Sequence, residues 1–137
     1  MKRNIIQNVQ YASADNPVLL DIGLPNFHRR NGRSPGVVVI HGGGWIAGNR
    51  RDSVPVEVSF ALMDAGYVVA NIDYKLGDNS WPQNLFDCKN AVRYFRLHAQ
   101  EFGIDPDRIG VVGASAGGHL AMMTALTTGI GVTFRII

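Results

Sequence analysis

Residues 109–121 read IGVVGASAGGHLA, and this stretch decides the fold. An apolar, β-branched run ends at Gly113, and a run of small residues that suits a helix begins at Ala116. Ser115 lies between them, in the spacing of a G-x-S-x-G turn from a strand into a helix. Such a turn holds its serine in a strained backbone conformation with the hydroxyl exposed. Glycines at 113 and 117 remove the side chains that would collide where the strand and the helix cross.

Two other glycine-loop motifs fail on the residues present. A Walker phosphate loop aligned on Gly113 and Gly118 requires Lys and then Ser or Thr, where this chain has His119 and Leu120. A dinucleotide-binding fingerprint that starts at Gly113 requires glycine at position 115, which is the serine. A tight turn that holds an ordinary serine remains the alternative to a nucleophile.

A second glycine cluster, His41–Trp45, follows the β-branched run Val37–Ile40. Such a run is typical of a strand buried on both faces of a parallel sheet. Acyl transfer creates a negative oxygen that needs preorganised donors, and consecutive glycines let backbone N–H groups reach it without obstruction. The alternative is a glycine-rich loop that only turns the chain. We interpret His41 itself as structural, hydrogen-bonding the loop.

The order of predicted elements favours an α/β fold with a mostly parallel sheet. Strands are predicted at 4–11, 18–23, 37–40, 67–73 and 109–113, and helices at 55–65, 83–101 and 116–128. The first two strands form a hairpin-like pair, and Asp105–Asp107 is a predicted turn. The helix at 83–101 carries one apolar stripe that includes Cys88, so we expect this thiol to be buried. Both glycine clusters lie at carboxyl ends of strands, where such sheets bind ligands.

Composition is that of one ordinary globular domain, with 137 residues, 46% apolar and 18% charged. The net charge of +2 and scattered basic residues argue against nucleic acid. The densest basic spots, His28–Arg30 and Arg50–Arg51, are interpreted as solvated loops. No apolar run approaches the roughly 18 residues of a membrane span, and the N-terminus lacks the apolar core of a signal peptide. A single cysteine excludes an internal disulfide and fits a reducing compartment, so we expect a cytoplasmic protein.

The motifs together give a resemblance to a known family. The chain resembles the N-terminal half of an α/β-hydrolase of the hormone-sensitive-lipase-like esterases, most closely the acetyl-esterase and feruloyl-esterase-like branch. The matching segments run in the family's order over about residues 18–128: Leu20–Pro25, His41–Trp45 with Ala47–Asn49, Asn71–Leu76, Trp81–Pro82, Phe102–Pro106 and Gly113–Ala121. The resemblance implies that residues 1–137 form a single, truncated domain with a partial α/β-hydrolase fold, from which the last strands are missing.

The resemblance also implies a serine carboxylic-ester hydrolase that forms an acyl-enzyme with short acyl or aryl esters. No metal or organic cofactor is implied. Ser115 is then the nucleophile, and the backbone N–H groups of Gly43, Gly44 and Ala116 form the oxyanion hole. Asp73 matches a position that braces loops near the site. His119 matches the family's motif and is not the family's base.

The chain departs from the family after the nucleophile. The family's acid and histidine follow the serine along the chain, but no Asp, Glu or His follows Leu120 here. We therefore expect impaired activity. A non-catalytic remnant, an interaction module and an amide hydrolase similar to formamidases remain alternatives.

The interaction-module reading depends on the strand at 109–113. If this strand lies at an open edge of the sheet, Ile109, Val111 and Val112 form an apolar edge that pairs with a second chain, unless residues 132–137 fold back over it. We expect the chain to self-associate through that edge.

Overall fold

The computed structural model describes residues 2–12, 15, 17–28 and 31–127. The elements, in chain order, are β1 (Asn4–Gln10), β2 (Leu19–Leu24), β3 (Ser34–Ile40), α1 (Ser53–Asp64), β4 (Val68–Ile72), α2 (Gln83–Leu97), α3 (Ala99–Phe102), β5 (Ile104–Gly113) and α4 (Ala116–Leu126). The strands form one sheet in the order β1-β2-β4-β3-β5. β3 runs parallel to β4 and β5, whereas β2 is antiparallel to β1 and β4. The α/β class and the hairpin-like β1–β2 pair are confirmed, and the sheet is mixed.

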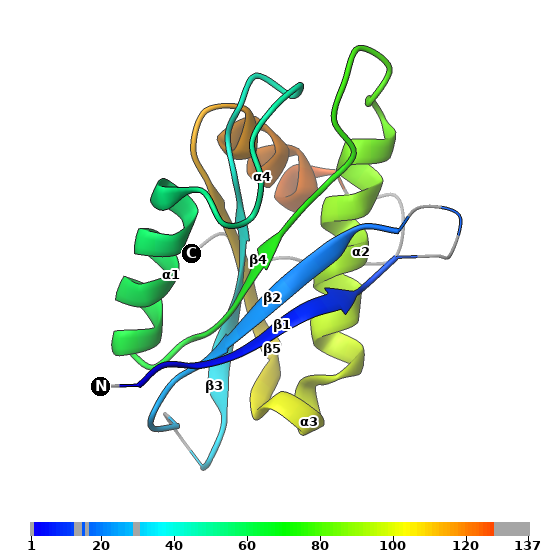
Figure 1. Ribbon diagram of the computed structural model, residues 1–137. Helices are drawn as coiled ribbons and strands as arrows, with labels where there is room; N and C mark the ends of the chain where they lie inside the picture. Colours follow the sequence, from blue (N-terminus) through cyan, green and yellow to red (C-terminus); the bar gives the residue numbers. More distant parts are fainter. Residues whose placement is uncertain (1, 13–14, 16, 29–30, 128–137) are drawn as a thin grey trace.

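Helices cover both faces of the sheet (Figure 1). Every residue of β3 is buried, as expected of a central parallel strand. Because side chains alternate along a strand, Val37 and Val39 pack with Met63 of α1 on one face. Val38 and Ile40 belong to the larger cluster on the other face, which α2 and α4 cover. This two-sided core fixes the positions of the strand ends that carry the candidate site.

The predicted helix at 83–101 is wrong at its C-terminal end. α2 ends at Leu97, and the four-residue α3 follows it and closes on Gly103, whose φ is 67°. The apolar stripe continues across the break through Ala99 and Phe102, so periodicity alone does not register it. Cys88 lies fully buried in this stripe, as predicted, and its burial raises the pKa of the thiol far above the ordinary range.

The predicted turn at Asp105–Asp107 is an irregularity inside a longer strand. β5 begins at Ile104, which pairs with Ser34, and the next pair joins Gly36 to Ile109. The extra residues of β5 bulge out of the ladder. The Asp105 carboxylate holds this bulge, since it accepts hydrogen bonds from the Asp107 amide (3.0 Å) and from Arg108 Nε (2.8 Å).

The apolar character expected of the β5 edge is also corrected. Among the described residues β5 pairs only with β3, so its other edge carries no partner strand. The side chains of Ile109 and Val111 are nevertheless buried in the core, and Val112 is half-buried against the cluster under α1. The edge therefore presents mainly backbone groups, and only the parts of Val111 and Val112 that line a groove beside it stay accessible. Residues 132–137 and position 128, the predicted end of the last helix, lie outside the described residues.

No helix in the described part of the chain has the length and apolar character needed to cross a membrane.

Candidate active site

Three parallel strands end at the same edge of the sheet. In the register of the ladder, Ile40 at the end of β3 lies beside Ile72 of β4 and Gly113 of β5. The segments that start at His41, Asp73 and Ala114 therefore emerge side by side. This edge, at the carboxyl ends of the strands, is where sheets of this kind bind ligands.

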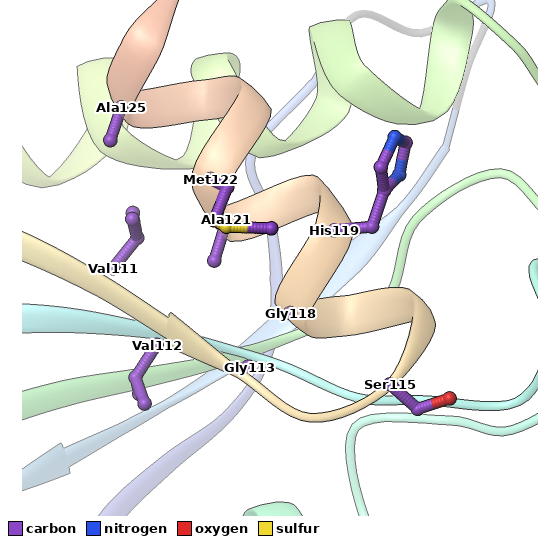
Figure 2. A pocket seen from close by; sticks show the side chains of 9 residues that line it. All are labelled: Val111, Val112, Gly113, Ser115, Gly118, His119, Ala121, Met122 and Ala125. Atoms are coloured by element: carbon purple, nitrogen blue, oxygen red, sulfur yellow. The ribbon is translucent and has the colours of Figure 1, made fainter.

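Ser115 stands at a tight bend between β5 and α4 (Figure 2). Its backbone has φ 56° and ψ −122°, a region that L-residues rarely occupy, and the residue is exposed. A Cβ on Gly113 would lie 2.2 Å from the Gly117 carbonyl oxygen, and a Cβ on Gly117 would lie 2.1 Å from the Ile40 carbonyl oxygen. The predicted strained serine between two obligatory glycines is confirmed.

The start of α4 leaves a backbone donor beside this serine. The Gly117 amide donates to the Ala114 carbonyl (3.0 Å) and the His119 amide to the Ser115 carbonyl (3.0 Å). The amide of Ala116, the first residue of the helix, has no acceptor among the described residues. A free N–H at the positive end of a helix favours a negative charge next to Ser115.

The loop after β3 lies directly against this bend. A Cβ on Gly42 would lie 2.9 Å from the Ala114 carbonyl oxygen and 3.4 Å from Ser115 Cβ. Gly43 has φ 133° and Gly44 has φ 64°, so the loop depends on left-handed backbone. The amides of Gly43 and Gly44 have no acceptor in the described part of the chain. The structure thus places the loop that carries Gly43 and Gly44 against the bend that carries Ser115 and Ala116, with Gly42 as the point of contact.

His41 and Tyr74 support this loop from beneath. The buried His41 ring donates through Nδ1 to the Gly42 carbonyl (2.6 Å) and stacks on the Tyr74 ring at a centroid distance of 4.4 Å. The Tyr74 hydroxyl donates to the His41 carbonyl (2.7 Å). Burial, with Cys88 nearby, raises the pKa of Tyr74, so its hydroxyl keeps the proton it donates. The structural role expected of His41 is confirmed.

Asp73 braces the far end of the same loop, as predicted. Its carboxylate accepts from the Arg50 backbone amide (2.8 Å) and pairs with Arg50 Nη1 (2.5 Å). The interpretation of Arg50–Arg51 as a solvated loop is wrong for Arg50, which is only 8% exposed, whereas Arg51 is exposed. Both arginines pair with Asp21 of β2, and Arg51 Nε lies 2.9 Å from its carboxylate. The sequence pattern missed these partners because they lie 23 to 30 residues away.

The other basic spot, His28–Arg30, is described only at His28. This residue is exposed, and its ring lies against Gly103, where an added Cβ would be 2.5 Å from the ring. Arg29 and Arg30 lie outside the described residues.

The chain is similar in sequence and in fold to known proteins. The BD-FAE family matches residues 20–132, which is most of the chain. The chain belongs to the BD-FAE family. The resemblance to α/β-hydrolase esterases is thereby confirmed.

Relatives of this BD-FAE chain include named esterases. It is 38% identical over 97 residues to the Probable carboxylic ester hydrolase LipM of Mycobacterium tuberculosis, and this match covers 70% of the chain and 22% of LipM. The solved structure of a Bacterial Heroin Esterase is 35% identical to this chain, with a TM-score of 0.73. The match covers 90% of this chain and 38% of the esterase chain. The structure of Thermogutta terrifontis esterase 2 phosphorylated by paraoxon is 29% identical to this chain, with a TM-score of 0.78. The match covers 91% of this chain and 48% of that esterase chain. The chain therefore spans less than half the length of these relatives.

A groove of about 500 Å³ runs from Ser115 along α4 (Figure 2). Its lining is mostly apolar and consists of Val111, Val112, Gly113, Ser115, Gly118, His119, Ala121, Met122 and Ala125. Within the described ranges there is no group of three or more His, Cys, Asp or Glu that could hold a metal ion. The groove therefore suits the apolar part of a small organic molecule whose polar group reaches Ser115.

Proposed function

We propose that Ser115 is the nucleophile of a serine ester-hydrolase site, and that the amides of Gly43, Gly44 and Ala116 form its oxyanion hole. One observation carries the proposal: the contact of Gly42 with Ala114 and Ser115 joins a strained, exposed serine to a loop with free N–H groups. The named relatives support ester chemistry, and one of them, Thermogutta terrifontis esterase 2, is phosphorylated by paraoxon.

The reaction follows from these positions. Ser115 Oγ attacks the carbonyl carbon of a short acyl or aryl ester, and the carbonyl oxygen becomes an oxyanion that the free amides stabilise. The carbonyl reforms, the bond to the alcohol oxygen breaks, and the alcohol leaves with the serine proton. Water then attacks the acyl-enzyme, which releases the acid and restores the hydroxyl. The apolar groove holds the apolar substituent of the ester.

A base for Ser115 is not among the described contacts. Of the four histidines, His41 bonds the Gly42 carbonyl, His98 pairs with Glu101 (3.0 Å), His119 accepts from Trp45 (3.3 Å), and His28 lies against Gly103. No Asp, Glu or His follows Leu120 in the sequence. A serine hydroxyl without a base is a poor nucleophile at neutral pH, so we infer weak turnover for this 137-residue chain.

Hydrolysis of p-nitrophenyl acetate tests the proposal. We expect at most the roughly 10³–10⁴-fold acceleration over water that enzymes keep after loss of a triad member, together with a slow release of one p-nitrophenol per chain as Ser115 is acylated. Ser115→Ala should abolish that release. Free imidazole gives the background for non-specific catalysis. A rate that Ser115→Ala leaves unchanged would refute the nucleophile. The anilide p-nitroacetanilide, run in parallel, separates ester from amide hydrolysis.

A second candidate role, an interaction module, is favoured by the edge of β5 that has no partner strand among the described residues. We infer that a second copy of the chain pairs with this edge, because unpaired strand N–H and C=O groups form a template for another strand. Light scattering at increasing concentration should show a mass above that of the monomer. A monodisperse monomer at high concentration would exclude this role.

A further inference from the structure

Both tryptophans of the chain converge on one histidine. Trp45 and Trp81 are 42% and 50% exposed, and they lie on two different loops. The His119 ring lies between them in α4, 5.5 Å from the Trp45 ring and 5.7 Å from the Trp81 ring, measured between centroids. Two exposed indoles that contact the same histidine are unusual on an ordinary surface, and the three rings form a defined cluster.

One contact in this cluster joins the two loops of the oxyanion hole. Trp45 Nε1 donates a hydrogen bond to His119 Nδ1 (3.3 Å) across 74 residues of sequence. Trp45 directly follows Gly44 and has a left-handed backbone, with φ 64°. His119 is one helical turn beyond Ser115, and its amide bonds the Ser115 carbonyl.

We propose that His119 is a positioning residue, which in its neutral form holds Trp45 and thereby keeps the Gly43 and Gly44 amides in register with Ser115 and Ala116. An indole N–H is only a donor, so the contact requires a lone pair on His119 Nδ1, and the proton of the neutral ring sits on Nε2. The value of this register for catalysis rests on the proposed function. The contact itself is tested without turnover.

Protonation of His119 removes the acceptor, so the register depends on pH. The protonated ring stays near the indoles through cation–π attraction but no longer bonds Trp45. α4 carries no other titratable group, and the loop from Gly42 to Asn49 carries none. On neighbouring elements, Lys75 and Asp78 are exposed on the loop that carries Trp81. The remaining titratable groups nearby are buried or already hydrogen-bonded: His41, Tyr74, Asp87, Cys88 and Lys89. The other charged groups lie later in α2 or at the start of β5: Arg93, Arg96, Asp105, Asp107 and Arg108.

Tryptophan fluorescence of the full chain reports on the cluster directly, because both emitters contact His119. An imidazolium quenches indole emission more strongly than a neutral imidazole. We expect one sigmoidal loss of emission as the pH is lowered and the His119 ring gains a proton. His119→Gln should abolish it, while His28→Gln and His98→Gln should keep it. A flat wild-type curve, or a transition that survives His119→Gln, would overturn the cluster.

The positioning role is tested by the backbone amide resonances of Gly43 and Gly44. In the wild type they should shift with the same midpoint as the fluorescence. Trp45→Phe, which removes the donor and keeps a ring, should abolish the shift. Trp81→Phe is the matched control, since Trp81 touches His119 without bonding it, and should preserve the shift. Resonances that titrate equally in Trp45→Phe would refute the positioning role.

The conservative variant provides the final check. A glutamine amide oxygen accepts the indole N–H and does not titrate, whereas leucine offers no acceptor. At pH 8 the Gly43 and Gly44 resonances should therefore stay near wild-type positions in His119→Gln and move in His119→Leu. Any acylation rate at Ser115 should fall about five-fold in His119→Leu only, as expected for one lost hydrogen bond. Absence of acylation in every variant would count against the proposed function, while the resonances would still decide the role of His119.

Discussion

Two loops meet at the candidate site, and they are held in different ways. The elbow (residues 113–117) is fixed by backbone packed against backbone, since added Cβ atoms at Gly113 and Gly117 would lie within about 2.2 Å of carbonyl atoms. The glycine loop (residues 41–49) has tight backbone packing inside it, since an added Cβ on Gly43 would lie 2.0 Å from the Ala47 carbonyl oxygen, but side chains hold its two ends in place. His41 stacks on Tyr74, and the Arg50 amide just beyond the loop bonds Asp73.

The two loops should therefore differ in the amino-acid substitutions that they tolerate. The elbow has no room for an added side chain, because its neighbours are main-chain atoms that cannot rotate away. The glycine loop depends on several polar contacts, each of modest net worth, so it weakens by steps. Substitutions at the elbow should therefore act on folding as a whole, and substitutions around the glycine loop should act gradually.

The largest effect is expected at the elbow. Gly117→Ala places a Cβ 2.1 Å from the Ile40 carbonyl oxygen and 2.6 Å from that of His41, so β3 must separate from α4. We expect a loss of about 3 kcal/mol or more in the free energy of unfolding, measured by urea denaturation, and in the extreme no folded protein.

The neighbouring glycine provides the matched control. A Cβ on Gly118 would lie 3.2 Å from the Gly113 carbonyl oxygen, which a small shift relieves, and alanine is the better helix former by about 1 kcal/mol. Gly118→Ala should therefore change stability by less than about 1 kcal/mol. Equal losses in both variants would contradict the account of the elbow.

A smaller loss is expected at the glycine loop. Asp73→Asn removes the charge that faces Arg50 while it keeps the shape of the side chain. The Asp73 side chain is 28% exposed, so we expect a loss of about 2 kcal/mol, below the full cost of breaking a buried pair. Chemical denaturation monitored by circular dichroism measures it.

Asp64→Asn is the control for that loss. It breaks the exposed pair with Arg3 (2.6 Å), and exposed pairs contribute little to stability. Its denaturation midpoint should match the wild type. If Asp73→Asn is as mild as Asp64→Asn, the glycine loop does not depend on Arg50.

The contrast also explains what could be predicted from the sequence. The elbow was predictable because its signal is local, with Gly113, Ser115 and Gly117 between a strand pattern and a helix pattern. The glycine loop and its free amides were predictable from HGGGW. Its supports were not, since Tyr74 and Asp21 come from distant segments and two adjacent arginines have the pattern of an exposed surface loop. The break at His98 was hidden by a continuous apolar stripe.

The smallest effect is a pH dependence carried by Asp21. Burial raises the pKa of this carboxyl, but hydrogen bonds from Arg51, the Asn8 amide and Arg50 outweigh it and leave the pKa below the ordinary value. The stabilisation is therefore complete above the unfolded pKa of about 3.9 and is lost as the pH falls through the lower folded value. The stability difference between wild type and Asp21→Asn should be constant above about pH 5 and shrink below pH 4. A difference that grows in acid would contradict the network.

Acylation of Ser115 tests the central claim most directly. If the elbow and the glycine loop form an oxyanion hole around a nucleophile, the chain should accumulate an acyl group after incubation with p-nitrophenyl acetate. Deacylation also needs a base, and the described residues place none at Ser115. Mass spectrometry with peptide mapping should place that group on Ser115 in the folded chain. The label should be absent from Ser115→Ala and from the wild type unfolded in urea. A label spread over lysines, or equal labelling of Ser115 in the folded and unfolded chains, would show that the geometry confers no reactivity.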